Sequence, residues 1–416
     1  MCGIVGLMCQ EGDVWTELYD SLIQLQHRGQ DAAGVITCTD KFHTKRGKGL
    51  VREVFGQSKP TDLPGQMGIG HVRYPTQGGN TIEEIQPFWI SQPYGLSLAH
   101  NGTLTNYQSL KQRLLTEEHQ HLNTESDSEL LLHYFSRRLA SMTNQHSFSF
   151  FDKLCHAIKF IFDHIKGGYA VVSTVLRQGL CAFRDPNGIR PLVIGQRSAS
   201  NGRMEYIIAS EPTMFFQLGF ERLDDVQPGE VVYVDTQGQL FRRQICKKKF
   251  APCAFEYIYF ARPDAKLNDI SVYRSRLRMG QNLAMQWLKT YPKDLPDVVI
   301  PIPFTSNTAA LAFANALNIR YTEGLYKNPF IGRTFIMPSK KKRQQSVRYK
   351  LSPQETEIKG KRVLLLDDSI VRGTTSKEIV SMVRELGAEK VYFASASPEV
   401  RYPCFYGIDM PTQQEF

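Results

Sequence analysis

Long apolar runs are missing from this chain of 416 residues. No stretch approaches the ~18 consecutive apolar residues of a membrane-spanning helix, which argues against a helical membrane protein. The first residues also lack the basic segment, apolar stretch and cleavage site of a secretory signal. We therefore expect a cytoplasmic protein without a membrane partner.

Paired cysteines are missing as well. No two cysteines show the C-x-x-C spacing of a zinc site or redox motif. Single scattered cysteines are typical of reduced thiols and not of a disulfide framework. The eight are Cys2, Cys9, Cys38, Cys155, Cys181, Cys246, Cys253 and Cys404.

Acidic residues are missing from residues 327–350, a segment that contains eight lysines and arginines. Because the formal net charge of the whole chain is +9, the remainder is nearly balanced. A positive field confined to one segment favours an anionic ligand beside it, and we expect no nucleic acid partner. The content of 42% hydrophobic and 22% charged residues is that of a globular protein with room for two or three domains.

The pattern of the first part predicts a mixed α and β domain. Asp13 is expected to cap a helix that runs through Gln26, and a capping box at residues 126–129 predicts another. From residue 168 to 243 many short alternating runs with turn signals predict antiparallel strands.

Residues 247–252 read as a hinge, and beyond them strands and helices alternate. This alternation predicts an α/β domain with a parallel sheet and helices on both faces. The expected domains are 2–245 and 246–416.

The clearest pattern of the second domain lies at residues 363–376. Four apolar residues, Val363–Leu366, predict a central strand buried on both faces. A small-residue turn then opens a helix, and such a helix N-terminus suits a phosphate. Asp367 and Asp368 lie where they can accept hydrogen bonds from sugar hydroxyls or face a hydrated cation. Taken alone, the two Asp residues also fit an ordinary solvated loop.

Cys2 has a special position among the cysteines. If the initiator Met1 is removed, one residue carries both a thiol and a free α-amine. That amine can take the proton of the thiol, so nucleophile and base reside in the same residue. A lone Cys at position 2 is more often an accident, and its context must decide.

The context is a series of motifs through the first half of the chain. They are Cys2–Gly6, Leu25–Gly34, Gly70–Tyr74, His100–Gly102 and Ser126–Asp127. In order and spacing they resemble the class II glutamine amidotransferases. The resemblance implies an N-terminal nucleophile glutaminase domain with an αββα sandwich fold.

The resemblance also implies roles for single residues. Cys2 would attack the glutamine amide, while the Asn101 side chain and the Gly102 N–H would bind the oxyanion. Arg73 would pair with the substrate carboxylate and Asp127 with its ammonium group. Without the resemblance, residues 100–102 fit a plain strand-to-turn step and Arg73 a surface ion pair.

The strand, acidic pair and Gly-Thr-Thr turn of the second half resemble the phosphoribosylpyrophosphate (PRPP) loop of type I phosphoribosyltransferases. Together the two halves resemble the glutamine PRPP amidotransferase family over essentially the whole chain. This implies a pentosyltransferase that hydrolyses glutamine and transfers the ammonia to PRPP. The products would be 5-phosphoribosylamine, glutamate and pyrophosphate, in the first committed step of purine (IMP) biosynthesis.

The family pattern implies a PRPP site and a metal site. Expected PRPP-binding residues are Lys327, Arg333, Asp367, Asp368, Ser369, Arg372, Gly373, Thr374, Thr375 and Ser376. One Mg²⁺ per subunit is expected at Thr305, Asp367 and Asp368, and the basic segment 327–350 is expected to act as a flap over the diphosphate. Phe304 departs from the family, which commonly has an acidic residue there.

One branch of the family binds an iron–sulfur cluster through four cysteines. Cys253 and Cys404 match two of those positions, and the other two would fall in a longer C-terminal tail, so we expect the cluster-free branch. Further expectations are purine nucleotides as feedback inhibitors and a homo-oligomer. Two alternatives stay open: a PRPP-sensing, nucleic-acid-binding regulator on the same fold, and a truncated form of low activity.

Overall fold

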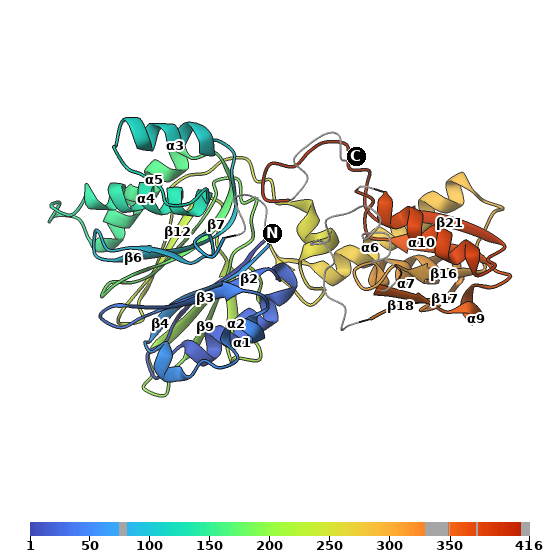
Figure 1. Cartoon of the computed structure of the whole chain (residues 1–416), viewed down its shortest axis with the longest axis horizontal. Coiled ribbons are helices and arrows are strands. Elements are labelled where there is room, and N and C mark those ends of the chain that lie inside the picture. Colours follow the sequence, from blue (N-terminus) through green and yellow to red (C-terminus); the bar gives the residue numbers. More distant parts are fainter. Residues whose placement is uncertain (75–80, 329–347, 349, 372, 409–416) are drawn as a thin grey trace. The chain divides into compact units, whose positions relative to one another are not determined.

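The computed structural model describes residues 1–74, 81–328, 348, 350–371 and 373–408, and the chain forms two units (Figure 1). Unit 1 comprises Met1–Cys253, Ala265–Asp269 and the described residues from Cys404 onward. Unit 2 comprises Ala254–Asp264 and Ile270–Pro403. The expected domain boundary between residues 245 and 246 stays a prediction.

Unit 1 is built on two antiparallel sheets. The first has the order β11 (Glu221–Asp225), β9 (Val193–Ser198), β10 (Met204–Ala209), β1 (Gly3–Met8), β4 (Met67–Arg73), β2 (Ala32–Cys38) and β3 (Phe42–Lys48). The second has the order β13 (Leu240–Gln244), β12 (Glu230–Asp235), β8 (Gly179–Arg184), β7 (Gly167–Val175), β6 (Leu96–Leu104) and β5 (Phe88–Ile90).

Helices cover the outer face of each sheet of unit 1 (Figure 1). On the first sheet lie α1 (Trp15–Leu25) and α2 (Val51–Phe55), with the short turns η1 (Gln26–Arg28) and η2 (Pro60–Asp62). On the second lie α3 (Tyr107–Thr116), α4 (Asp127–Ala140) and α5 (Phe150–His164). Side chains such as Ile4, Ile69 and Val172 fill the space between the sheets. The four layers confirm the expected αββα sandwich.

The cap expected at Asp13 and the capping box expected at residues 126–129 were wrong. α1 begins after Val14, and the Asp13 carboxylate instead accepts the N–H of Gly65 at 2.7 Å. Ser126 does cap α4, accepting the N–H of Ser128. No capping box forms, because the Glu129 carboxylate accepts N–H groups of residues 123 and 124 in the preceding loop.

Unit 2 contains a parallel sheet of four strands, as expected. Their order is β17 (Arg320–Tyr321), β16 (Val298–Pro301), β20 (Arg362–Asp367) and β21 (Lys390–Ser395). The helices among the described residues of this unit are α6 (Val272–Thr290), α7 (Asn307–Leu317), α9 (Glu355–Ile358) and α10 (Thr374–Glu385), with a π-helical turn η3 (Glu256–Phe260). Strands β18 (Leu325–Lys327) and β19 (Leu351–Pro353) form a separate antiparallel pair.

The two faces of β20 pack into two different cores. Val363 and Leu365 face Ile379 and Val383 of α10. Leu364 and Leu366 lie in a core with residues of α6 and α7. Since successive side chains of a strand point to opposite faces, the apolar run is buried on both sides, as expected of a central parallel strand.

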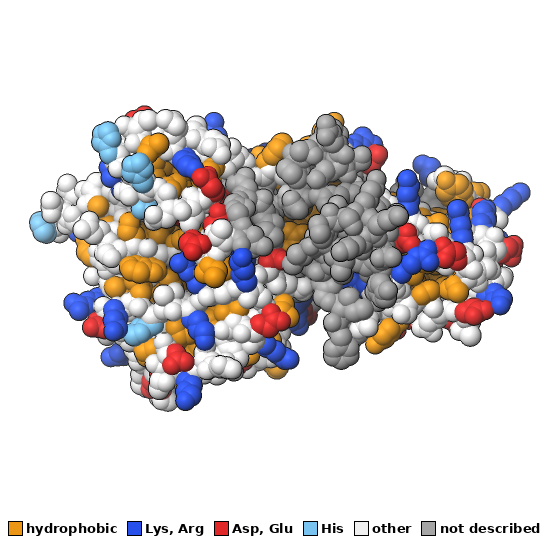
Figure 2. Space-filling view, viewed as in Figure 1, with side chains coloured by type: hydrophobic (Ala, Val, Ile, Leu, Met, Phe, Trp, Pro, Cys, Tyr) orange, Lys and Arg blue, Asp and Glu red, His pale blue; other side chains and the backbone are white. Residues whose placement is uncertain are grey.

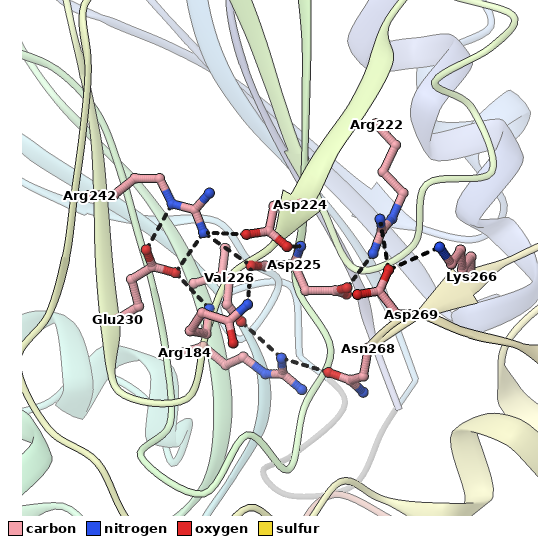
Figure 3. Close-up of polar contacts among 11 residues, drawn as sticks. Arg184, Arg222, Asp224, Asp225, Val226, Glu230, Arg242, Lys266, Asn268 and Asp269 are labelled. Carbon is pink, nitrogen blue, oxygen red and sulfur yellow. Dashed lines mark hydrogen bonds and ion pairs between the residues drawn. The ribbon is translucent and has the colours of Figure 1, made fainter.

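A tight turn holds the segment Ala265–Asp269 in unit 1 (Figure 3). It joins β14 (Lys266–Leu267) to β15 (Ile270–Ser271) through Asn268 and Asp269, both of which have positive φ. Asn and Asp tolerate this left-handed conformation better than most residues. The buried Arg184 donates from Nη1 to Asn268 Oδ1 at 3.0 Å, which fixes the turn on the end of β8.

The visible surface carries charges of both signs. Lys and Arg side chains alternate with Asp and Glu side chains over the described part of both units in Figure 2. This mixture fits the near balance of charge outside residues 327–350. Among the helices of the described residues, we find none with the length and apolarity to cross a bilayer.

Candidate active site

A pocket of unit 1 contains most of the residues expected to act on glutamine. It encloses an empty volume of about 330 Å³, part of which is open to solvent. Its lining residues are Cys2, Arg73, Tyr74, Glu84, Gln86, His100, Gly102, Ser126 and Asp127. Strand pairing explains the meeting: Gly3 pairs with Val72 across β1 and β4, which sets Cys2 beside Arg73.

Hydrogen bonds hold Cys2 on three sides. Its backbone N–H donates to Asn101 Oδ1 at 3.2 Å, and its carbonyl accepts from Arg28 Nε at 3.0 Å. Its Sγ lies 3.6 Å from the carbonyl oxygen of Tyr74. Met1 precedes it and is buried. The nucleophile candidate therefore has a defined position at the edge of the pocket.

The side chain of Asn101 has a hydrogen-bond donor, Nδ2, that is not used among the described residues. It is fully buried, and within the described part of the chain its Nδ2 has no hydrogen-bond partner. A buried donor without a partner is costly unless a ligand supplies an acceptor. This NH₂ group beside Cys2 is suited to an oxyanion that forms when the thiolate attacks an amide.

Gly102 is a position that only glycine fits. Its φ is +147°, and an added Cβ would lie 2.0 Å from the carbonyl oxygen of Gly168 on β7. Strands β6 and β7 therefore approach each other closely at the pocket wall. This close approach brings the backbone at Gly102 to the pocket beside Cys2.

Asp127 begins α4 and lines the pocket. Its Oδ2 accepts the N–H of Leu104 at 3.0 Å, and its Oδ1 lies 3.7 Å from Nδ1 of His100. The N-terminal end of a helix favours a negative charge at this position. The carboxylate is thus available to a cationic group of a ligand.

Arg73 forms a buried ion pair across the pocket. Its Nη2 lies 3.2 Å from Oε2 of Glu84, and less than a tenth of either side chain is exposed. Residue patterns did not indicate Glu84, which belongs to none of the motifs recognised in the sequence. Arg28 was also missed: it belongs to a motif, but its buried partner Glu211 lies 183 positions away along the chain.

The second cluster lies at the carboxyl ends of β16 and β20 in unit 2. The Asp368 carboxylate accepts hydrogen bonds from Thr305 Oγ1 and, at 2.5 Å, from Ser369 Oγ. The N–H of Asp368 donates to Oδ1 of Asp367 at 2.9 Å. The structure therefore brings together the three residues expected at the metal, Thr305, Asp367 and Asp368.

Burial makes this acidic pair difficult to ionise. Burial first, and the charge of Asp368 second, raise the pKa of Asp367 to about 8. Burial also raises the pKa of Asp368, against the opposing effect of the hydroxyls of Ser369 and Thr305 and of the Arg276 charge. Two carboxylates and a hydroxyl are oxygen ligands of the type that Mg²⁺ binds, and a divalent cation would offset their repulsion.

The structure describes most of the expected phosphate loop. Gly373, with φ +64°, precedes α10, and Thr374 is the first residue of that helix. Thr375 is exposed and Ser376 half-buried in its first turn. Arg333 and Arg372 lie outside the described residues, as does most of the basic segment 327–350.

Lys327, at the end of β18, lies over an aromatic ring. Its Nζ is 4.8 Å from the ring centroid of Phe304, whose side chain is largely exposed. A cation over the face of an aromatic ring is attracted by the ring quadrupole. Phe304 thus contacts one of the residues expected to bind PRPP.

Comparison with known proteins decides the family. A sequence family described as a glutamine amidotransferase domain matches residues 79–217. The chain is 51% identical over 417 residues to the amidophosphoribosyltransferase of Pseudomonas aeruginosa, an alignment that covers 100% of this chain and 82% of that protein. The chain belongs to the amidophosphoribosyltransferase family.

Other members of the amidophosphoribosyltransferase family agree. The Escherichia coli protein is 49% identical over 418 residues, covering 100% of this chain and 82% of that one. A solved glutamine PRPP amidotransferase from B. subtilis, complexed with ADP and GMP, superposes with a TM-score of 0.84 at 37% identity, covering 99% of this chain and 85% of that chain. These relationships confirm the expected family and fold class.

Proposed function

We propose that this member of the amidophosphoribosyltransferase family hydrolyses glutamine at Cys2 and transfers the ammonia to PRPP. The products are 5-phosphoribosylamine, glutamate and pyrophosphate, which is the committing reaction of purine biosynthesis. The observation that carries the proposal is the buried Nδ2 of Asn101 beside Cys2, which has no hydrogen-bond partner among the described residues, in a chain of this family.

Five residues act on glutamine. After loss of Met1, the α-amine of Cys2 accepts the proton of its thiol, and the thiolate attacks the side-chain amide. Asn101 Nδ2 and the backbone N–H of Gly102 stabilise the oxyanion, and the leaving ammonia takes up a proton from the amine. Water then attacks the γ-glutamyl thioester and gives it one proton by way of the amine, which releases glutamate and restores the Cys2 thiol. Arg73 binds the carboxylate of glutamine and Asp127 its ammonium group.

The loop after β20 binds the second substrate. Asp367 and Asp368 face the ribose hydroxyls, and the N-terminal turn of α10, from Gly373 to Ser376, receives the 5′-phosphate. Thr305, Asp367 and Asp368 are the residues that would hold Mg²⁺, which supplies charge neutralisation for the departing diphosphate. Lys327 and, from the residues that the structure does not describe, Arg333 and Arg372 complete the expected PRPP contacts.

The remaining expectations concern partners and cofactors. The B. subtilis relative was solved with ADP and GMP, which supports purine nucleotides as feedback inhibitors here. A homo-oligomer, a cytoplasmic location, the flap role of residues 327–350 and the absence of an iron–sulfur cluster stay predictions. The PRPP-sensing regulator gains no support, since such a regulator has no need of a glutaminase site.

The test combines glutamine, PRPP, Mg²⁺ and protein and measures pyrophosphate release. We expect release that requires all four, with glutamate formed in equal amount. Release with ammonia but not with glutamine would leave only the second site active. Very slow turnover with all four present would favour the truncated, low-activity form, and salt-sensitive DNA binding without turnover would favour the regulator.

A further inference from the structure

The residue proposed to bind the carboxylate of glutamine already has a carboxylate beside it. Glu84 lines the same pocket as Arg73, and the Arg73 Nη2 to Glu84 Oε2 distance is 3.2 Å. Both side chains are less than a tenth exposed, so water screens the pair poorly. A ligand carboxylate that enters the pocket must therefore compete with the Glu84 carboxylate for Arg73.

The Glu84 carboxylate and the α-carboxylate of glutamine would both bind the Arg73 guanidinium. A planar guanidinium binds a ligand carboxylate best through two adjacent N–H groups, which include an Nη atom. With glutamine bound, the carboxylates of the ligand and of Glu84 would lie against one guanidinium in a confined pocket. Like charges held together out of water oppose each other, so one of them must withdraw or bind less well.

The charge count of the pocket points the same way. Glutamine is a zwitterion, and Arg73 with Asp127 would match its two charges. Glu84 adds a further negative charge to that set. These three side chains carry one excess negative charge both before and after the zwitterion binds. Around Arg73 alone, the sum is zero with Glu84 and becomes −1 when the carboxylate of glutamine arrives.

We propose that Glu84 is an internal competitor for Arg73 that sets the affinity of the pocket for glutamine. The proposal rests on the proposed function, in which Arg73 binds the substrate carboxylate. If Glu84 occupies Arg73 in about nine molecules of ten, the apparent affinity for glutamine falls about tenfold. A glutamine analogue without the α-carboxylate leaves the pair undisturbed and is not subject to this competition.

The test replaces Glu84 by Gln, which keeps the shape and removes the charge. We expect E84Q to lower the KM for glutamine three- to tenfold with little change in kcat. The KM for 4-aminobutanamide, which is glutamine without its α-carboxylate, stays the same. Glutamate, which carries the same α-carboxylate and ammonium, inhibits E84Q at correspondingly lower concentration.

Glu83→Gln is the matched control, since Glu83 is the exposed neighbour and does not line the pocket. Its KM for glutamine should equal that of the unmodified protein. Glu84→Asp is the second variant, because its shorter side chain withdraws the carboxylate from Arg73 without removing it from the chain. It should shift the KM in the same direction as E84Q, and ammonia-dependent synthesis reports that each variant is folded.

A raised or unchanged KM for glutamine in both Glu84 variants would overturn the proposal; a raised one would make Glu84 a residue that holds Arg73 in place. Failure of the proposed function gives a different result. In that case Arg73→Lys would leave the KM for glutamine unchanged, or the unmodified protein would show no glutamine-dependent pyrophosphate release.

Discussion

Asn101 accepts the backbone N–H of Cys2 through Oδ1, at 3.2 Å, and its Nδ2 is buried beside the same residue. One amide group thus contacts the nucleophile candidate through its oxygen and carries the donor that, in the proposed function, binds the oxyanion. The relationship joins β1 to β6, two strands of different sheets. The glutaminase site therefore depends on the packing of the whole sandwich.

Asn101→Ala removes the oxyanion donor. We expect kcat for glutamine hydrolysis to fall about 10²–10³-fold, the usual cost of losing one such donor. Ammonia-dependent synthesis, which does not use this site, serves as the control. Glutamine hydrolysis within threefold of the unmodified protein would contradict the role of Asn101.

Cys2→Ser removes the nucleophile and keeps the α-amine. Glutamine-dependent synthesis should fall by roughly 10⁴-fold or more, as expected when a nucleophile is lost. Synthesis with added ammonium salt should continue, because the proposed PRPP site lies in unit 2. If both activities disappear in a folded variant, the assignment of glutamine hydrolysis and PRPP turnover to two separate sites is wrong. N-terminal sequencing of the active protein should begin at Cys2.

Asp367 and Asp368, at the end of β20, are expected to be required for PRPP turnover. Replacing both Asp367 and Asp368 by Asn should end PRPP turnover and spare a basal glutaminase activity. Unchanged KM and kcat for PRPP would refute their role.

Asp367→Asn alone should also change the pH dependence of stability. The pKa of Asp367 rises on folding from 3.8 to about 8, so the protonated carboxyl stabilises the fold at low pH. That contribution disappears as the pH rises through about 8. Without metal, Asp367→Asn should melt above the unmodified protein at pH 8, and the two should converge near pH 4. Equal Tm values at pH 8 would contradict the raised pKa of Asp367 in the folded protein.

Phe304→Leu tests the ring beneath Lys327. Losing a cation–π contact worth about 0.5–1 kcal/mol should raise the KM for PRPP about two- to fivefold. Phe304→Tyr keeps the ring and should behave like the unmodified protein. A Leu variant with an unchanged KM for PRPP would show that the ring does not position Lys327 for the substrate.

The sequence indicated the sites that consist of contiguous motifs. The strand at residues 363–366 and the helix that follows it carry their own periodicity, and the turn between them is local. Cys2, Asn101 and Asp127 were expected to meet through a family resemblance; Cys2 and Asp127 line one pocket, and Asn101 is hydrogen-bonded to Cys2 behind it. For the strand at residues 363–366, the turn and the helix after it, local residue patterns were enough to predict the secondary structure.

The contacts that were missed are set by tertiary packing. Glu84 lies in a turn before β5 and meets Arg73 at the end of β4, and Arg28 meets Glu211 across 183 positions. Asp13 and Glu129 had the right residue type for a helix cap, but nearby loop N–H groups took their carboxylates. Local patterns cannot decide between such competing partners, because tertiary packing sets the distances.

The most direct test of the account is the requirement for both substrates in one reaction. The protein is mixed with glutamine, PRPP and Mg²⁺, and pyrophosphate and glutamate are measured together, with each component omitted in turn. The account predicts equal amounts of both products, and no pyrophosphate when glutamine or PRPP is left out. Pyrophosphate released at the same rate without glutamine or any other ammonia source would contradict it.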